Sequence, residues 1–422
     1  MLRSYQDSRQ AKSFLCREFS IPHAPMTHPA GNHLRLRRSK RHAFVRMIVG
    51  IAASASLTFG NELPTAEQMD AALRRGVDFL IQHQNPNGSW GGPTRTKKLN
   101  IYAPLPGAHH AFRAGASGLA LSGLIDARDT RDEAKAAIAK GADWISAELP
   151  NLRRADPTTT YNVWGHAYGL RALSRLHRIE TEPSRKEHWA RLAQEQVDLA
   201  GRYEEVNGGW GYLDLFDEVA TQKPSGTPTS FTTATLLLAM DEARREMAVK
   251  ISEPTCRRAL DSIRVQRTPD FSYTYSFSHR MHPRNDINRP AGSLARSQVC
   301  NACLRAYGDA TVSDEVIHTW AKRFIDREGF LSIGRKRPVP HETHFRISGY
   351  FYYYGIYYFT ESVRFLPKPA QAEYAKSLAA ILLARQEKDG SWWDYPLYDY
   401  HQPYGTGYAL MALSWCRDAI AE

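Results

Sequence analysis

A seven-residue motif with fixed spacing occurs at both ends of the folded part of this chain. It reads Gln-x-x-x-Gly-x-Trp at Gln84–Trp90 and again at Gln386–Trp392. A third copy, Glu204–Trp210, has the same spacing with Glu in place of Gln. Each copy follows one helix-like segment and precedes another. Similarity at long intervals is the signature of a repeat architecture, so we expect an array of similar structural units.

Six segments rich in small and apolar residues align in one helical register. The equivalent reference positions are Ser117, His166, Thr233, Cys300, Tyr352 and Thr406. The residues four positions later are Leu121, Leu170, Leu237, Leu304, Ile356 and Leu410. The residues seven positions later are Leu124, Leu173, Met240, Tyr307, Phe359 and Leu413. Because these two positions share one face of an α-helix, each segment is predicted to bury that face against a partner helix.

The partner helices are predicted in the segment that precedes each of these six. They lie near 69–83, 132–147, 188–203, 254–266, 313–326 and 370–386. Six helical hairpins without a convincing alternating strand pattern predict an all-α fold, an α/α toroid in which six outer helices surround six inner helices. An open helical solenoid is the alternative, because the sequence does not show whether the array closes on itself.

The net charge of +11 is unevenly distributed along the chain. Residues 1–60 contain ten Lys and Arg against two Asp and Glu, a net +8, which leaves +3 for residues 61–422. The folded part is nearly balanced, so no nucleic-acid partner is expected. The sequence therefore predicts a basic leader over 1–60 and a single toroid domain over 61–422.

The leader has the layout of an export signal. A basic stretch between Arg35 and Arg46 precedes the apolar run Met47–Ala53 and further small residues up to Gly60. This order predicts export to the periplasm or the extracellular space. A basic tail on a cytosolic protein is one alternative. Another is that the uncleaved segment stays as an anchor, which would give a peripheral association with the membrane or envelope.

The face of each inner helix opposite to the buried stripe is predicted to line the axis of the toroid. Two positions before the reference stand Gly115, Trp164, Phe231, Gln298, Tyr350 and Tyr404. Two positions after it stand Leu119, Tyr168, Thr235, Ala302, Tyr354 and Tyr408. We expect a cavity for an apolar small molecule lined by Trp164, Tyr168, Phe231, Tyr350, Tyr354, Tyr404 and Tyr408. A core filled by these rings is the alternative.

The same face becomes charged farther along the helices. Five positions after the reference stand Ser122, Arg171, Leu238, Arg305, Tyr357 and Met411. Nine positions after it stand Asp126, Arg175, Glu242, Asp309, Glu361 and Trp415. The sequence therefore predicts an axis with one aromatic end and one charged end.

Candidates for acid–base chemistry occur in the connections that lead into inner helices. Glu342, Asp399 and His401 are the catalytic candidates that we expect near the mouth of the toroid. Three paired motifs, two His-x-x-His and one Cys-x-x-Cys, occur without the further ligands of a known metal site: His279 and His282, His341 and His344, Cys300 and Cys303. No metal and no cofactor is expected.

The repeated motif and the six hairpins resemble those of the terpenoid cyclase and protein prenyltransferase superfamily, most of all a single toroid of the squalene-hopene cyclase type over roughly residues 65–420. The resemblance implies that the motif residues stabilise the junctions between hairpins, the Gln by capping and the Trp by packing. These residues are Gln84, Gly88, Trp90, Gly208, Trp210, Gln386, Gly390 and Trp392. The segments at 143–153, 266–273 and 326–331 are degenerate copies at best.

The catalytic signatures of that superfamily are missing from the sequence. There is no Asp-x-Asp-Asp, with which such cyclases protonate an alkene, and no Asp-x-Cys, with which prenyltransferases hold zinc. His401 lies near a position similar to that of the last zinc ligand. The Cys-Gly-Glu-Gln thioester of complement-like toroids is also missing.

Three functional hypotheses remain open. The first is a cyclase-like toroid that binds or transforms an isoprenoid or a similarly apolar ligand. The second is an exported carbohydrate-active toroid, which needs two carboxylates that face each other across a cleft. The third is a non-catalytic toroid that binds a protein or an envelope component through an external apolar patch.

Overall fold

Outer and inner helices alternate along the part of the chain that the computed structural model describes, residues 63–96, 106–152, 162–211 and 227–422. The outer helices are α2 (Ala66–Gln82), α4 (Asp132–Glu148), α6 (Pro183–Gly201), α8 (Glu253–Val265), α10 (Asp314–Asp326) and α13 (Lys368–Arg385). The inner helices are α3 (Pro106–Ala127), α5 (Asn162–Ile179), α7 (Ser230–Met247), α9 (Leu294–Ala306), α12 (Tyr352–Val363) and α14 (His401–Ala421). All six predicted hairpins are present. The predicted leader lies outside the described residues.

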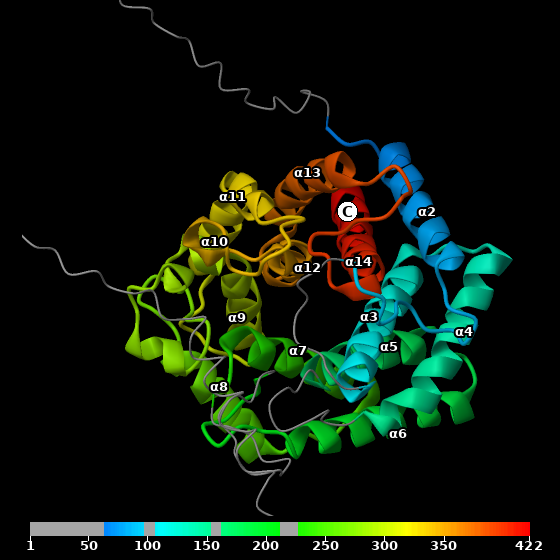
Figure 1. Ribbon diagram of the computed structural model, residues 1–422, viewed down its shortest axis with the longest axis horizontal. Helices are drawn as coiled ribbons and strands as arrows, with labels where there is room; N and C mark the ends of the chain where they lie inside the picture. Colours follow the sequence, from blue (N-terminus) through cyan, green and yellow to red (C-terminus); the bar gives the residue numbers. More distant parts are fainter. Residues whose placement is uncertain (1–62, 97–105, 153–161, 212–226) are drawn as a thin grey trace, which may run out of the picture. The chain divides into compact units, whose positions relative to one another are not determined.

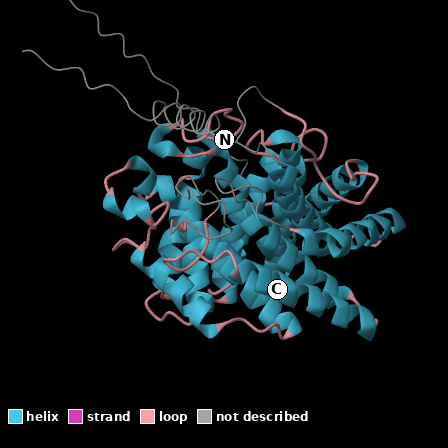
Figure 2. Cartoon of the chain, turned by 60° about the horizontal axis from the view of Figure 1, so that its bottom comes forward, coloured by secondary structure: helices cyan, strands magenta, loops and turns pink. Residues whose placement is uncertain are grey.

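The connections contain one short α-helix and several 3-10 turns. The α-helix is α11 (Glu328–Ile333). The 3-10 turns are η1 (Leu149–Asn151), η2 (Ser278–Met281), η3 (Asp286–Asn288), η4 (Ala291–Ser293), η5 (His344–Arg346), η6 (Gly349–Phe351) and η7 (Tyr398–Tyr400). The described segments contain isolated β-bridges but no strand, as Figure 2 shows, so the all-α prediction is confirmed.

The inner helices form a closed ring (Figure 1). Contacts run from α3 to α5, α7, α9, α12 and α14 in chain order, and α14 in turn contacts α3. The outer helices lie around this ring. The predicted α/α toroid is thus confirmed. The open solenoid is excluded, because the last inner helix packs directly on the first.

The predicted stripe on the inner helices is buried. The residues four positions after the reference all have 0% exposure: Leu121, Leu170, Leu237, Leu304, Ile356 and Leu410. Gly76 on α2 shows how tightly this stripe meets an outer helix, since a Cβ there would lie 2.9 Å from Leu410 Cδ2. Each of these six buried side chains stabilises the fold by roughly 1.5–3 kcal/mol, which explains why the same register is kept in all six inner helices.

The Gln-x-x-x-Gly-x-Trp motif forms the turn from an outer helix to an inner helix. In the first copy, the indole N–H of Trp90 donates to Leu80 O of α2 at 2.8 Å. Its backbone N–H donates to Ser117 Oγ of α3 at 2.9 Å. Gln84 Nε2 donates to Ala137 O of the next outer helix, α4, at 2.9 Å. One motif therefore ties three helices together.

The glycine of the motif is required by its conformation and by its neighbour. Gly88 has a φ of 90°, and a Cβ there would lie 2.2 Å from Lys140 O of α4. Gly390 in the last copy has a φ of 89° and would meet Arg75 O of α2 at 2.4 Å. No other residue type fits both constraints.

The last copy of the motif closes the ring. Gln386 Nε2 donates to Ala72 O of α2 at 2.9 Å, so the sixth hairpin is joined to the first as the first is joined to the second. The degenerate segment at 266–273 takes the same turn, with a bridge between Arg267 and Tyr273 and a φ of 61° at Phe271. Of the other two degenerate segments, the described part of 143–153 continues α4 into η1, and 326–331 continues α10 into α11, so neither takes this turn.

Candidate functional site

An aromatic cavity lies on the axis, between the N-terminal halves of the inner helices. Its described lining consists of aromatic, aliphatic and Gly residues: Phe112, Gly115, Ala116, Leu119, Trp164, Tyr168, Phe231, Tyr350, Phe351, Tyr354, Leu397, Tyr400, Tyr404 and Tyr408. The cavity has a volume of about 140 Å³. One water molecule needs only ~10–15 Å³ by the same measure, so the rings do not fill the axis.

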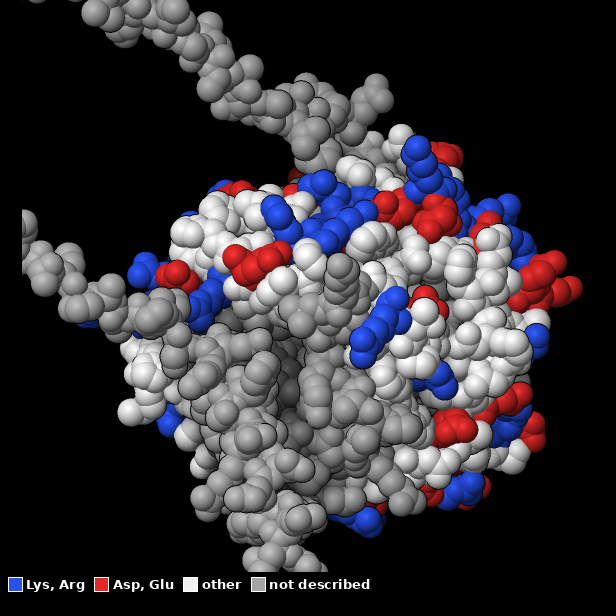
Figure 3. All heavy atoms as spheres, in the orientation of Figure 1, with Lys and Arg blue, Asp and Glu red and all other residues white. Residues whose placement is uncertain are grey.

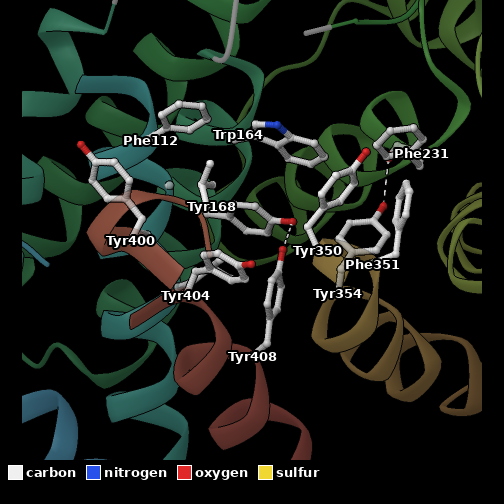
Figure 4. Close-up of a pocket in the computed structure, with 14 residues that line it drawn as sticks. Phe112, Trp164, Tyr168, Phe231, Tyr350, Phe351, Tyr354, Tyr400, Tyr404 and Tyr408 are labelled. Atoms are coloured by element: carbon white, nitrogen blue, oxygen red, sulfur yellow. Dashed lines mark hydrogen bonds between the residues drawn. The ribbon is translucent and has the colours of Figure 1, made fainter. Parts of the chain in front are cut away.

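All seven aromatic side chains that were predicted to line the cavity lie on its wall (Figure 4). The wall also contains aromatic residues that the helical register did not predict. Phe351 and Tyr400 lie in the 3-10 turns η6 and η7, to which a helical register does not extend. Phe112 lies one helical turn before Gly115 on α3, so extending the axial stripe by one turn would have found it.

The axial register fails on α9. Gln298 and Ala302 are not among the lining residues. Gln298 Nε2 instead donates to Trp320 O of the outer helix α10 at 2.9 Å. A buried amide needs a hydrogen-bond partner, and Gln298 finds one on the outer helix and not at the axis.

The aromatic rings of the wall pack on one another. The indole of Trp164 stacks on Phe231 with centroids 6.1 Å apart, and on Tyr168 at 6.0 Å. Tyr168 and Tyr408 meet edge to face at 5.6 Å. Such pairs stabilise by about 0.5–1.5 kcal/mol beyond their buried area, so the wall is preorganised.

Tyrosine hydroxyls on the wall bond to protein groups. Tyr408 Oη donates to Tyr168 Oη, and Tyr354 Oη lies 2.9 Å from Thr235 Oγ1 on α7. Thr235 was itself predicted to line the axis, and it acts here as the partner of a lining residue. Because these hydroxyls are satisfied within the wall, the cavity presents ring surface to a ligand.

One carboxyl group lies directly behind the wall. Asp394 is fully buried, and its Oδ1 accepts a hydrogen bond from Tyr404 Oη at 2.5 Å. Its Oδ2 accepts from the backbone N–H of Tyr353 at 2.9 Å. Burial raises the pKa of Asp394 to about 6, against the opposing effect of these hydrogen bonds. Asp394 was not among the residues predicted from sequence, although it follows the last motif by only two positions.

A histidine holds a second wall tyrosine. His341 Nδ1 lies 2.8 Å from Arg346 O, which can only accept, so Nδ1 carries the proton. Nε2 then accepts from Tyr350 Oη at 2.8 Å. Burial lowers the pKa of His341 to about 4, which keeps the ring neutral near pH 7. The cavity thus has a titratable group behind each of two lining tyrosines.

The three residues proposed from sequence for acid–base work lie off the cavity wall. Glu342 and Asp399 are exposed. His401 is half-buried, lies 2.8 Å through Nδ1 from Tyr398 O, and contacts the ring of Trp393 at 5.0 Å. The structure therefore does not bring these three residues to the cavity.

The other end of the axis holds a charged cavity, also between the inner helices. Arg171 and Arg175 of α5 are buried there, and Glu242 accepts from both at 3.0 and 3.1 Å. Arg171 also donates to Glu361 at 3.1 Å. Burial would raise the pKa of Glu361, but the arginines outweigh it and hold that pKa at about 2. This end of the axis is an ion-pair network.

Metal and thiol chemistry find no support in the described segments. No group of three or more His, Cys, Asp or Glu side chains there could hold a metal ion. Cys300 and Cys303 are unpaired and buried in α9, and burial raises the pKa of both thiols, which makes them inert. In the same segments, no helix has both the length and the apolar character that crossing a bilayer requires.

Comparison with known proteins supports the fold. No protein-family model and no curated protein matches the sequence. The structure is similar to the unsaturated glucuronyl hydrolase of Bacillus sp. GL1, with a TM-score of 0.54 and 14% identity over 83% of this chain and 96% of that chain. It is also similar to cellobiose 2-epimerase from Spirochaeta thermophila, with a TM-score of 0.52 and 14% identity over 85% of this chain and 99% of that chain.

A type II terpene cyclase from Scytonema also matches, with a TM-score of 0.49 and 14% identity over 84% of this chain and 99% of that chain. The similarity to the hydrolase and the epimerase, at low identity, shows the α/α toroid and does not select a substrate.

Proposed function

We propose that the aromatic cavity binds an isoprenoid-like apolar molecule. The observation that carries this proposal is the composition of the wall. Ten of the fourteen described lining residues are aromatic, and none of the fourteen carries a charge. The transfer of an apolar chain from water to such a wall lowers the free energy by about 25 cal/mol per Å² of buried surface. The faces of the rings also attract any positive charge that develops on a bound molecule.

The carbohydrate-active alternative needs chemistry that this wall does not offer. Glycoside hydrolysis uses two carboxyl groups roughly 5–10 Å apart across the scissile bond. No Asp or Glu is among the described lining residues. Asp394 lies behind Tyr404, with both oxygens engaged. The isoprenoid proposal is therefore preferred to a sugar-cleaving activity.

Binding of a ladder of isoprenoid alcohols tests the proposal. Geraniol, farnesol and geranylgeraniol would be titrated by calorimetry, beside a cello-oligosaccharide. We expect at least one alcohol to bind and the saccharide to show no heat. Trp164→Ala should weaken the binding of the alcohol about 30-fold, which is the loss that truncation of a hot-spot residue typically causes. Trp393→Ala is the matched control, because Trp393 is half-buried but not among the lining residues.

Two results would contradict the proposal. One is saccharide binding that Trp164→Ala abolishes while the alcohols do not bind. The other is alcohol binding that Trp164→Ala and Trp393→Ala leave equally unchanged, which would place the ligand elsewhere on the molecule.

A further inference from the structure

Two connections interrupt the regular hairpin repeat and lie against each other. One is 278–290, between α8 and α9, and the other is 327–346, which contains α11 and leads to α12. The turn η3 of the first contacts η5 of the second. Within the second, the rings of Phe330 and Phe345 lie 5.9 Å apart. We call the surface formed by these two connections the basic rim.

The basic rim adjoins the aromatic cavity. His341 belongs to the rim and accepts the hydrogen bond of Tyr350, which lines the cavity. The ring of Tyr275, just before the first connection, lies 5.5 Å from His341 and 5.2 Å from the lining residue Phe231. Anything that docks on the rim therefore sits beside the ligand cavity.

The rim exposes several large apolar side chains. Eight large hydrophobic residues are exposed in the described part of the chain, and four of them belong to the rim. They are Met281, Phe330, Ile333 and Val339, with exposed fractions between 38% and 76%. Phe330 and Ile333 are three residues apart on α11 and share one side of it. A cluster of this kind marks an interaction surface more often than scattered single residues do.

The rim also concentrates positive charge. Its two segments contain eight Lys and Arg against three Asp and Glu, a net +5, whereas residues 61–422 as a whole carry only +3. The rest of the folded part is therefore slightly acidic. Lys and Arg side chains gather on the face drawn in Figure 3, toward the edge where Figure 1 places α11 and α13.

Several arginines of the rim form no ion pair with an Asp or Glu of the described segments. Arg284, Arg327, Arg337 and Arg346 are exposed. Among the described residues, the ion pairs of the rim's basic side chains are those of Arg289, Arg335 and Lys336, and none of them includes these four. The positive charge of the rim is thus available to a partner.

We propose that the basic rim docks on an anionic lipid surface. Exposed apolar side chains between unpaired basic residues match the boundary between acyl chains and anionic headgroups, where the first group is buried and the second stays at the surface. A nucleic acid would use the arginines but leave Met281, Phe330 and Ile333 in water. This inference stands without the proposed function, although docking would also bring the cavity beside a reservoir of apolar molecules.

Hydrogen–deuterium exchange on the full chain tests the docking. The protein would be mixed with phosphatidylcholine vesicles, with or without phosphatidylglycerol, and peptides would be followed by mass spectrometry. The basic leader of the same chain can hold the protein to anionic vesicles, so total binding is not the readout. We expect slower exchange in peptides from 278–290 and 327–346 with the anionic vesicles only. Peptides that contain the exposed Ile179 and Val206 should not change.

A variant pair makes the result specific to the rim. The rim variant combines Phe330→Ser, Ile333→Ser and Arg337→Glu and should abolish the local protection. The serines remove apolar surface that would enter the lipid, and each basic residue lost weakens attachment about fivefold. Ile179→Ser combined with Val206→Ser is the matched control and should keep it.

Three results would overturn the proposal. They are protection that survives in the rim variant, equal protection by neutral vesicles, and protection of the same peptides by duplex DNA or poly-glutamate but not by vesicles.

Discussion

The two ends of the toroid axis are formed by the same inner helices but differ in the groups that they bury, which are aromatic rings at one end and ion pairs at the other. On α5, Trp164 and Tyr168 line the aromatic cavity, and Arg171 and Arg175 lie two turns farther along in the charged cavity. The charged cavity is the larger, with about 230 Å³ against about 140 Å³. Volume therefore does not select the ligand site, and the chemistry of the wall does.

The difference lies in what a ligand would have to displace. At the charged end, every Arg, Asp and Glu of the described lining already belongs to an ion pair. Breaking a buried pair leaves an uncompensated charge, which is costly. At the aromatic end, the hydroxyls are satisfied within the wall, and only ring surface meets the space. An apolar ligand can occupy that end without breaking any bond.

Removal of Arg171 should have the largest effect. Arg171→Met leaves Glu242 and Glu361 partly uncompensated in a buried site, so we expect a loss of about 3–5 kcal/mol in the free energy of unfolding. Urea denaturation measures this loss. Arg128→Met is the matched control, because Arg128 pairs with Asp418 at the exposed surface and should cost no more than about 1 kcal/mol. Equal losses in the two variants would mean that the charged end does not depend on buried pairs.

The pH dependence of stability should differ in sign between the two ends. Asp394 has its pKa raised from 3.8 to about 6, so the stability that its protonated form contributes is present below about pH 4 and is lost as the pH rises through 6. Glu361 has its pKa lowered from 4.5 to about 2, so its contribution is present above about pH 4.5 and is lost as the pH falls through 2.

Asp394→Asn isolates the first of these effects. The amide imitates the neutral acid and does not titrate. As the pH rises from 4 to 7, the free energy of unfolding of the variant should therefore increase by about 2–3 kcal/mol relative to that of the wild type. Unfolding by urea at a series of pH values measures the difference. A difference that stays constant over this range would show that Asp394 is not the buried acid that we describe.

Tyr408→Phe should have the smallest effect. It tests whether the hydroxyl of Tyr408 bonds within the wall and not to the ligand. The hydrogen bond to Tyr168 is lost, which should cost about 1 kcal/mol of stability. The affinity for an isoprenoid alcohol should not change, because the ring remains. A loss of affinity comparable to that of Trp164→Ala would mean that the hydroxyl contacts the ligand.

Sequence periodicity predicted the helices and much of the cavity, for a physical reason. Positions four and seven repeat because each inner helix buries the same face, and the opposite face then points to the axis. This logic placed Trp164, Tyr168 and Tyr408 on the wall. It failed at Gln298, where a buried amide needed a partner on the outer helix α10. Periodicity says nothing about such a requirement.

Ring closure and the buried acid lay beyond what the sequence could predict. Closure depends on the summed rotation between successive hairpins, and it is seen in the packing of α14 on α3 and in the hydrogen bond from Gln386 to Ala72 O. Asp394 stands in a connection, where no helical register applies, and its environment is made by Tyr404 and the backbone of Tyr353. The carboxylates chosen from sequence, Glu342 and Asp399, are exposed instead.

The most direct test of the central claim is a crystal structure of the protein purified from its source without added ligand. We expect elongated density of an apolar molecule on the axis between Trp164, Phe231 and Tyr404, and a charged cavity that holds only water among its ion pairs. Density for a ligand among Arg171, Arg175 and Glu361, with the aromatic cavity collapsed, would contradict the account.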